Sequence, residues 1–423
     1  MKKAHLAALV FAAVLCSVYG ESHASFHSGA TGKCEGCHAF GGTSQYPAAG
    51  AVPEQGRTSL RGSDPSSTCL ICHEPPPGAV MGEAHFVSTA SGIPGQLTPG
   101  GDFGWLKKNY RWRGEGGAIE TSQGEKHGHN IVAADYGYHA SQLKPLAPGG
   151  NYASAALSCI SCHDPHGNYR RNADGSISTS GAPIIGSGSY NTSPNPDANG
   201  SVGSYRLLAG KGYKTQAQAG QEFLADPPAA VAPAQYNRSE SATDTRVAYG
   251  SGMSEWCQNC HGQIHASNGT QHVSGNNAQL SFEIIGNYND YVKSGNLNGS
   301  VSESYSSLVP YEMGSEDYTL LKRVANSDGS NLSGPGANGD RPNVMCLSCH
   351  RAHASGWDGM TRWNMEATFI VENGAYPSVD RGGRAENAQG RSASDVRAAF
   401  YDRPASRFAV FQRSLCNKCH ARD

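Results

Sequence analysis

A five-residue unit, Cys-x-x-Cys-His, occurs six times in this chain of 423 residues and constrains its fold more than any other feature. The chain has 13 cysteines, and every cysteine beyond Cys16 belongs to one of these units. The six units are Cys34/Cys37/His38, Cys69/Cys72/His73, Cys159/Cys162/His163, Cys257/Cys260/His261, Cys346/Cys349/His350 and Cys416/Cys419/His420.

The histidine after each second cysteine distinguishes haem attachment from the other uses of paired cysteines. A disulfide framework does not require it, and a thioredoxin-like motif occurs once per domain. Structural zinc pairs two such cysteine units and does not require the histidine either. Two thiols three positions apart can bond both vinyl groups of a haem while the next imidazole binds its iron. We therefore predict six haem c groups, with the six motif histidines as proximal iron ligands.

The composition is unusual for a chain of this length. It contains 53 Gly and 22 Pro, and only 38% of its residues are hydrophobic. Successive units are 35 to 98 residues apart with no fixed period, which argues against a solenoid. We expect a haem-cored multihaem cytochrome c fold, mostly loops with short α-helices and very little β structure. Helices are predicted at 215–225, 256–266, 315–325, 393–401 and 405–421, and a strand at 282–285.

The N-terminus has the pattern of a secretory signal peptide. Lys2 and Lys3 precede an apolar run at about 6–18, and small residues follow it. We expect residues 1–24 to be the signal and residues 25–423 to form a single hexahaem domain. No later run approaches the roughly 20 apolar residues of a membrane-spanning helix, so no transmembrane anchor is expected. Export to the cell surface or beyond is predicted, with the periplasm as the alternative.

The charge pattern excludes nucleic acid as a partner. The formal net charge is −2, and the sequence has no basic cluster. Haem propionates would make the loaded protein more acidic.

Nine further histidines remain in the mature chain as candidates for the distal side of six irons. His166 and His353 each lie three residues beyond a proximal histidine, so each could bind the iron of a different haem. His265 could do the same or hydrogen-bond a propionate, because it lies one helical turn after His261. The other candidate ligands are His27, His85, His129 and His272, whereas His127 and His139 are expected at the surface.

Several segments, most of whose residues lie outside the haem units, carry a resemblance to a known family. They are GGDFGW at 100–105, GHNIV at 128–132, CISCHDPHG at 159–167, MSEWC at 253–257, CLSCHRAHASGWD at 346–358 and LCNKCHARD at 415–423. Across essentially the whole mature chain, the sequence resembles the hexahaem outer-surface cytochrome S (OmcS) type, whose members polymerise into extracellular filaments. The resemblance implies closely stacked bis-histidine haems that continue from subunit to subunit.

The resemblance also implies which histidines are distal ligands. The positions that match the family's non-proximal histidines are His27, His85, His129, His166, His265, His272 and His353, seven candidates for six positions. The chain departs from the family pattern at Gly41, where relatives have a histidine that is donated to a haem of the adjoining subunit. Either another histidine, such as His127 or His139, replaces it, or the subunit junction is built differently.

The leading functional hypothesis is a conductor without catalysis, a homopolymer that delivers electrons to other cytochromes and to external acceptors such as metal oxides. One alternative is a multihaem enzyme of nitrite or hydroxylamine chemistry with one open haem. Another is a soluble periplasmic electron shuttle. Six regular motifs, and enough histidines for six distal positions, favour the conductor.

Overall fold

The computed structural model of the protein describes residues 27, 33–39, 59–76, 85–215, 217–218, 220–233, 247–264, 274–291, 309–325, 341–414 and 416–420. Its helices are short, and the longest, α5 (Phe282–Tyr291), has 10 residues. The other α-helices are α2 (Pro65–His73), α4 (Met253–Cys257), α6 (Tyr318–Ala325), α7 (Cys346–Cys349), α8 (Ala385–Ala388), α9 (Ala393–Ala399) and α10 (Cys416–Cys419). No helix in these ranges is both long enough and apolar enough to cross a membrane.

The β structure consists of small, separate ladders. Four antiparallel pairs are β1 (His38–Ala39) with β2 (Ser59–Leu60), β3 (Tyr110–Arg113) with β4 (Ile119–Ser122), β9 (Ala230–Val231) with β10 (Ala248–Tyr249), and β11 (Phe369–Val371) with β12 (Gln412–Arg413). One four-stranded sheet has the order β6 (Ile177–Ser178), β5 (Arg170–Arg171), β8 (Ser201–Gly203), β7 (Ile184–Gly186). The predicted fold of loops, short helices and very little β structure is confirmed.

The buried apolar side chains of the described residues form five separate clusters. The largest surrounds Trp105, Tyr288 and Trp357. The other four are centred on Leu321, Met345, Leu70 and Phe223. A domain stabilised by side chains alone usually has one contiguous core. The divided core is what we expect where haem supplies much of the apolar interior.

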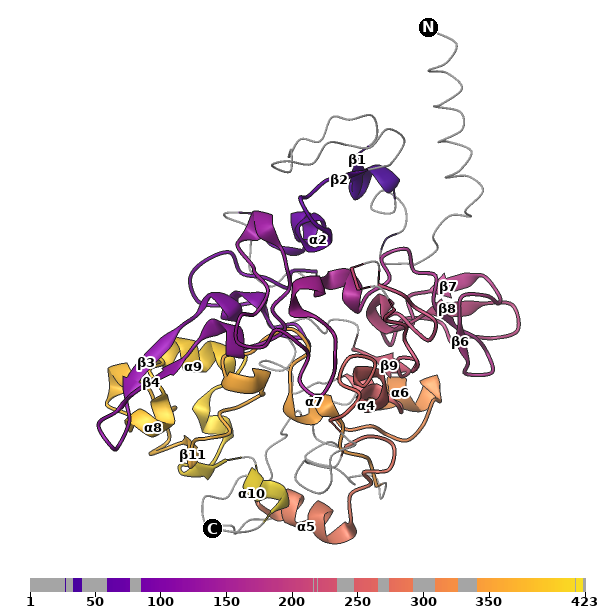
Figure 1. Cartoon of the computed structure of the whole chain (residues 1–423). Coiled ribbons are helices and arrows are strands. Elements are labelled where there is room, and N and C mark those ends of the chain that lie inside the picture. The colour runs from indigo at the N-terminus through magenta and orange to yellow at the C-terminus, as the bar shows by residue number, and fades with distance from the viewer. Residues whose placement is uncertain are drawn as a thin grey trace, which may run out of the picture.

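Figure 1 shows how segments distant in sequence are brought together. The β3–β4 hairpin lies beside α8 and α9, which come from the C-terminal part of the sequence. β1 and β2 with α2 lie at the top of this view, and α10 lies at the bottom beside α5. The first and last haem motifs are therefore at opposite ends of the molecule.

Two predicted helices are confirmed, because α6 lies within 315–325 and α9 within 393–401. The strand predicted at 282–285 is wrong, since these residues form the first turn of α5. Ile285 and Tyr288 are buried three positions apart, the period of a helix rather than a strand.

The remaining helix predictions failed where tertiary contacts override local propensity. The described residues of 215–225 contain no helix. α4 ends at Cys257, and the chain beyond it turns back so that Gln263 donates its N–H to the carbonyl of Gly149 at 2.6 Å. Of the described residues in 405–421, only the four of α10 are α-helical, because β12 pairs with β11.

Candidate haem-binding sites

Each Cys-x-x-Cys-His motif is wound into a helical turn. In four motifs the histidine N–H donates to the carbonyl of the first cysteine: His163 to Cys159 (3.1 Å), His261 to Cys257 (3.1 Å), His350 to Cys346 (2.9 Å) and His420 to Cys416 (3.0 Å). Residues three and four positions apart share one face of such a turn. All twelve motif cysteines lie in the described part of the chain, and none forms a disulfide. Both thiols could therefore attach one porphyrin while the imidazole binds its iron.

Cysteines of successive motifs lie near one another. Cys37 of the first motif interacts electrostatically with Cys72 of the second, and Cys69 of the second motif interacts with Cys159 of the third. The series continues with Cys162 near Cys260, Cys257 near Cys346, and Cys349 near both Cys416 and Cys419. The six motifs thus follow one another in space in the order of the sequence.

The proximal imidazoles are oriented by backbone carbonyls. The Nδ1 atom of His73 donates to the carbonyl of His85 (2.6 Å), that of His163 to Arg206 (2.8 Å), that of His261 to Pro148 (2.8 Å) and that of His350 to Gly359 (2.8 Å). Such a bond fixes the ring and its tautomer and leaves Nε2 for a metal. Four proximal histidines therefore have the second contact typical of a metal-bound imidazole.

Imidazoles of motif histidines lie in pairs with imidazoles of histidines outside the motifs. A metal–imidazole bond is roughly 2 Å long, so two rings on opposite sides of one iron have centres about 6 Å apart. The ring centres are 6.4 Å apart for His38 and His166, 6.4 Å for His163 and His353, and 6.0 Å for His129 and His261. His166 and His353 thus each face the proximal histidine of another motif. The spacing fits a porphyrin held between the two rings.

His73 has two imidazole neighbours, His27 at 6.3 Å and His85 at 6.2 Å between ring centres. The Nδ1 atom of His27 donates to the carbonyl of Pro165 at 3.2 Å, which leaves its Nε2 for iron. The carbonyl of His85 is instead the acceptor for His73 Nδ1, so the His85 backbone lies on the side of His73 that faces away from an iron. His27 is therefore better placed than His85 to bind an iron opposite His73.

Burial keeps these imidazoles neutral. It lowers the pKa of His73 and of His129 to about 4, and that of His353 to about 3. Burial also lowers the pKa of His38 and of His163. The neutral imidazole is the form that binds a metal.

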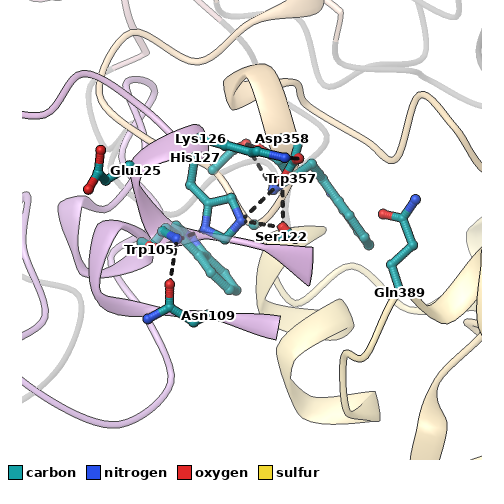
Figure 2. Close-up of polar contacts among 12 residues, drawn as sticks. Trp105, Asn109, Ser122, Glu125, Lys126, His127, Trp357, Asp358 and Gln389 are labelled. Atoms are coloured by element: carbon teal, nitrogen blue, oxygen red, sulfur yellow. Dashed lines mark hydrogen bonds and ion pairs between the residues drawn. The ribbon is translucent and has the colours of Figure 1, made fainter. Parts of the chain in front are cut away.

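His127, expected at the surface, is fully buried at 0% exposure. Its Nδ1 atom donates to the carbonyl of Trp105 at 2.9 Å, and its Nε2 atom lies 2.7 Å from Ser122 Oγ and 3.5 Å from Asp358 Oδ1 (Figure 2). With both ring nitrogens engaged, His127 has no atom left for iron. The expectation of a surface position for His127 is wrong, and His127 cannot replace the ligand absent at Gly41. His139, as expected, is exposed.

The carboxylate of Asp358, in the loop that follows His350, contacts the imidazole of His127. Burial would raise its pKa, but hydrogen bonds with His127 and Ser122 lower it to about 2. Ser122 Oγ also accepts from the buried guanidinium of Arg391 at 3.0 Å. The carboxylate of Asp358 is therefore held in a network that spans three distant segments.

Several predicted features lie outside the described residues. They are the candidate ligands His265 and His272, the departure at Gly41 and the signal peptide at 1–24.

No sequence pattern indicates the carbonyl acceptors at Pro148, Arg206 and Gly359. Every residue carries a carbonyl, so only the fold selects which one meets Nδ1 of a proximal histidine.

No family model matches the chain. It is 47% identical, over an alignment of 438 positions that covers 100% of both chains, to the C-type cytochrome OmcS of Geobacter sulfurreducens. Among solved structures, it is similar to the outer membrane cytochrome S filament of Geobacter sulfurreducens, with a TM-score of 0.80. It is also similar to the OmcS nanowires of the same organism, with a TM-score of 0.81. Each structural match has 46% identity and covers 92% of this chain and 98% of the other.

Proposed function

The chain belongs to the OmcS family of c-type cytochromes, and on this basis we propose that it carries electrons outside the cell as a subunit of a homopolymeric filament. The observation that carries this proposal is the pairing of a motif imidazole with an imidazole from outside that motif, with ring centres 6.0–6.4 Å apart. It supports an iron with a protein ligand on each face.

Six haem c groups would be held by the twelve motif cysteines, with His38, His73, His163, His261, His350 and His420 as proximal ligands. The paired rings support His166 as the distal ligand opposite His38, His27 opposite His73, His353 opposite His163 and His129 opposite His261. The irons at His350 and His420 would take their distal ligands from His85, His139, His265 and His272, or from an adjoining subunit.

Haem iron with two imidazole ligands supplies reversible one-electron transfer and leaves no coordination position for a substrate. Burial favours the neutral imidazole by lowering the pKa of His38, His73, His129, His163 and His353. Backbone carbonyls orient several of the imidazoles through Nδ1. The proximity of cysteines in successive motifs supports an unbroken series of six sites from β1 to α10. These features favour conduction over the open-haem enzyme.

Residues 1–24 would direct export, and residues 25–423 would form the single hexahaem domain. The family membership places the protein at the cell surface or in the extracellular space. External acceptors such as metal oxides would be reduced by outer-sphere transfer at exposed haem edges.

Three measurements on the purified, haem-loaded protein test the proposal. We expect six haems per chain by pyridine haemochrome assay and only low-spin ferric signals in electron paramagnetic resonance of assembled material. Electron microscopy should show regular fibres. A stoichiometric high-spin signal together with nitrite turnover would contradict the conductor and support the enzyme. Discrete particles would support the soluble shuttle.

A further inference from the structure

Two segments that accept hydrogen bonds from proximal imidazoles have the same backbone conformation. In segment 204–209, Arg206 has φ 51° and ψ 33°, and Leu207 has φ 59°. In segment 357–362, Gly359 has φ 68° and ψ 16°, and Met360 has φ 50°. Consecutive left-handed residues are typical of the central positions of a type I′ turn.

The first turn docks on the third haem motif by a specific set of bonds. Asp164 donates its N–H to the carbonyl of Leu207 at 2.8 Å, and Ala209 donates to the carbonyl of Cys162 at 3.0 Å. Between these two bonds, His163 Nδ1 donates to the carbonyl of Arg206 at 2.8 Å.

The second turn repeats this arrangement at the fifth motif. Arg351 donates its N–H to the carbonyl of Met360 at 2.8 Å, and Arg362 donates to the carbonyl of Cys349 at 2.8 Å. His350 Nδ1 donates to the carbonyl of Gly359 at 2.8 Å. The two sites therefore coincide position by position, although the two turn sequences, Ser204-Tyr-Arg-Leu-Leu-Ala and Trp357-Asp-Gly-Met-Thr-Arg, share no residue.

A left-handed backbone is unfavourable for residues with a Cβ atom, yet three of these four positions are not glycine. At Arg206, the guanidinium stacks on Tyr190 at 4.7 Å and lies 5.9 Å from the ring of Tyr205, which anchors the strained residue. Strain of this kind persists only where the surrounding structure enforces it, and it concentrates at functional sites.

We propose that these two left-handed turns position the imidazoles of His163 and His350, with the backbones of Arg206 and Gly359 as the positioning residues. Each turn presents one carbonyl to Nδ1 and so fixes the plane in which the ring meets the iron. The inference rests on the proposed haem ligation. It assigns the effect to the backbone conformation and not to the side chain at the turn.

The second turn allows a matched comparison. An added Cβ at Gly359 would meet only Thr361 Cγ2 at 3.9 Å, and one at Gly117, with φ 77° between β3 and β4, would meet nothing within 4 Å. Gly359→Val and Gly117→Val therefore impose the same kind of backbone penalty, with room for the added Cβ atom at both positions. In the oxidised, haem-loaded protein, we expect Gly359→Val to shift or broaden one low-spin paramagnetic resonance signal. Gly117→Val should lower thermal stability only. Identical spectra for the two variants would overturn the proposal.

Variants of the first turn distinguish the effect of the backbone from that of the side chain. They also test the proposal if Gly359→Val does not fold. Arg206→Gly keeps the left-handed backbone, so we expect it to retain the low-spin signals. Arg206→Val should change the signal of one haem, because a β-branched residue resists this conformation. A change of equal size in Arg206→Gly would show that the side chain matters and would overturn the proposal. If the wild-type protein has no bis-histidine signal, the proposed function itself fails.

Discussion

At the scale of single residues, the position of the His353 imidazole depends on two glycines. The His353 N–H donates to the carbonyl of Gly100 at 2.7 Å, and its Nδ1 atom lies 3.3 Å from the carbonyl oxygen of Gly101. Gly101 has φ 94°, and a Cβ atom there would lie 1.8 Å from the carbonyl oxygen of Ala354. No other amino acid fits this close approach.

Gly101→Ala should therefore disturb the ligand pair of His163 and His353. We expect a loss of about 3 kcal/mol in the free energy of unfolding, because the clash adds to the left-handed strain. We also expect a new high-spin ferric signal from one haem. Gly92→Ala is the matched control, since Gly92 has φ 84° and nothing within 4 Å of an added Cβ. High-spin signals in both variants, or in neither, would contradict this account.

His127 and His129 are close in sequence but should behave differently when truncated. His127→Ala removes the hydrogen bonds to Ser122 Oγ and to the carbonyl of Trp105 and leaves a cavity at a fully buried position, which should cost about 3 kcal/mol of stability. Its haem spectrum should stay low-spin. His129→Ala should instead convert the iron of His261 to high spin. Thermal unfolding and paramagnetic resonance of both variants check this contrast, and a high-spin signal in His127→Ala would refute it.

The attachment residues could be predicted because haem chemistry fixes their spacing within five positions. The burial of His127 could not, since it depends on Ser122 and on Asp358, which lie 236 residues apart. Polar residues are usually exposed, so the sequence alone favoured the surface. The pairing of His166 with His38 likewise depends on the tertiary fold, which brings two distant segments together. The three-residue spacing from His163 indicated only that His166 could bind the iron of a different haem.

At the scale of elements, the N-terminus of α4 is held by a buried carboxylate. Glu312 accepts from the N–H groups of Met253 at 2.8 Å and Ser254 at 3.4 Å. Burial, and after it the charge of Glu255, raises the pKa of Glu312 to about 7. α4 carries Cys257, so this carboxylate supports a haem attachment turn.

A pKa that is higher in the folded state gives a stability contribution that is complete below the unfolded value of about 4.5. The contribution is lost as the pH rises through 7. We expect the melting temperature of the haem-loaded protein to fall between pH 5 and pH 8, and to fall less in Glu312→Gln. Calorimetry across this range measures the difference. Parallel curves for the two proteins would show that Glu312 does not titrate in this way.

Element boundaries were predicted well only where local sequence decides them. α9 begins with Ser392, whose hydroxyl caps the N–H of Asp395 in a capping box that can be recognised in the sequence. In 405–421, by contrast, the pairing of Gln412 with Val371 determines a strand. Such long-range pairing leaves no periodic trace in the residues themselves.

At the scale of the whole molecule, the five separate apolar clusters suggest that the chain cannot sustain its fold without haem. Four of the five clusters are small, and the conformational entropy of many ordered loop residues opposes them. Chain produced without haem attachment should therefore lack a cooperative thermal transition. It should also be digested by protease much faster than the loaded protein. Near-ultraviolet circular dichroism and limited proteolysis are suitable measurements, and a cooperative transition in the haem-free chain would disprove this expectation.

Long-range hydrogen bonds tie the segment around residues 98–129 to the segment around residues 352–401. Nδ1 of His129 donates to the carbonyl of Ala352, 223 residues further on, and the Tyr401 hydroxyl donates to the carbonyl of Thr98, 303 residues back. A chain is made from its N-terminus, so the early motifs exist before these partners do. On the proposed ligation, haem attachment at the third motif can therefore precede formation of its ligand pair, because His353 follows His163 in the chain. The site of His163 would then be completed only when the segment that carries His353 has been made.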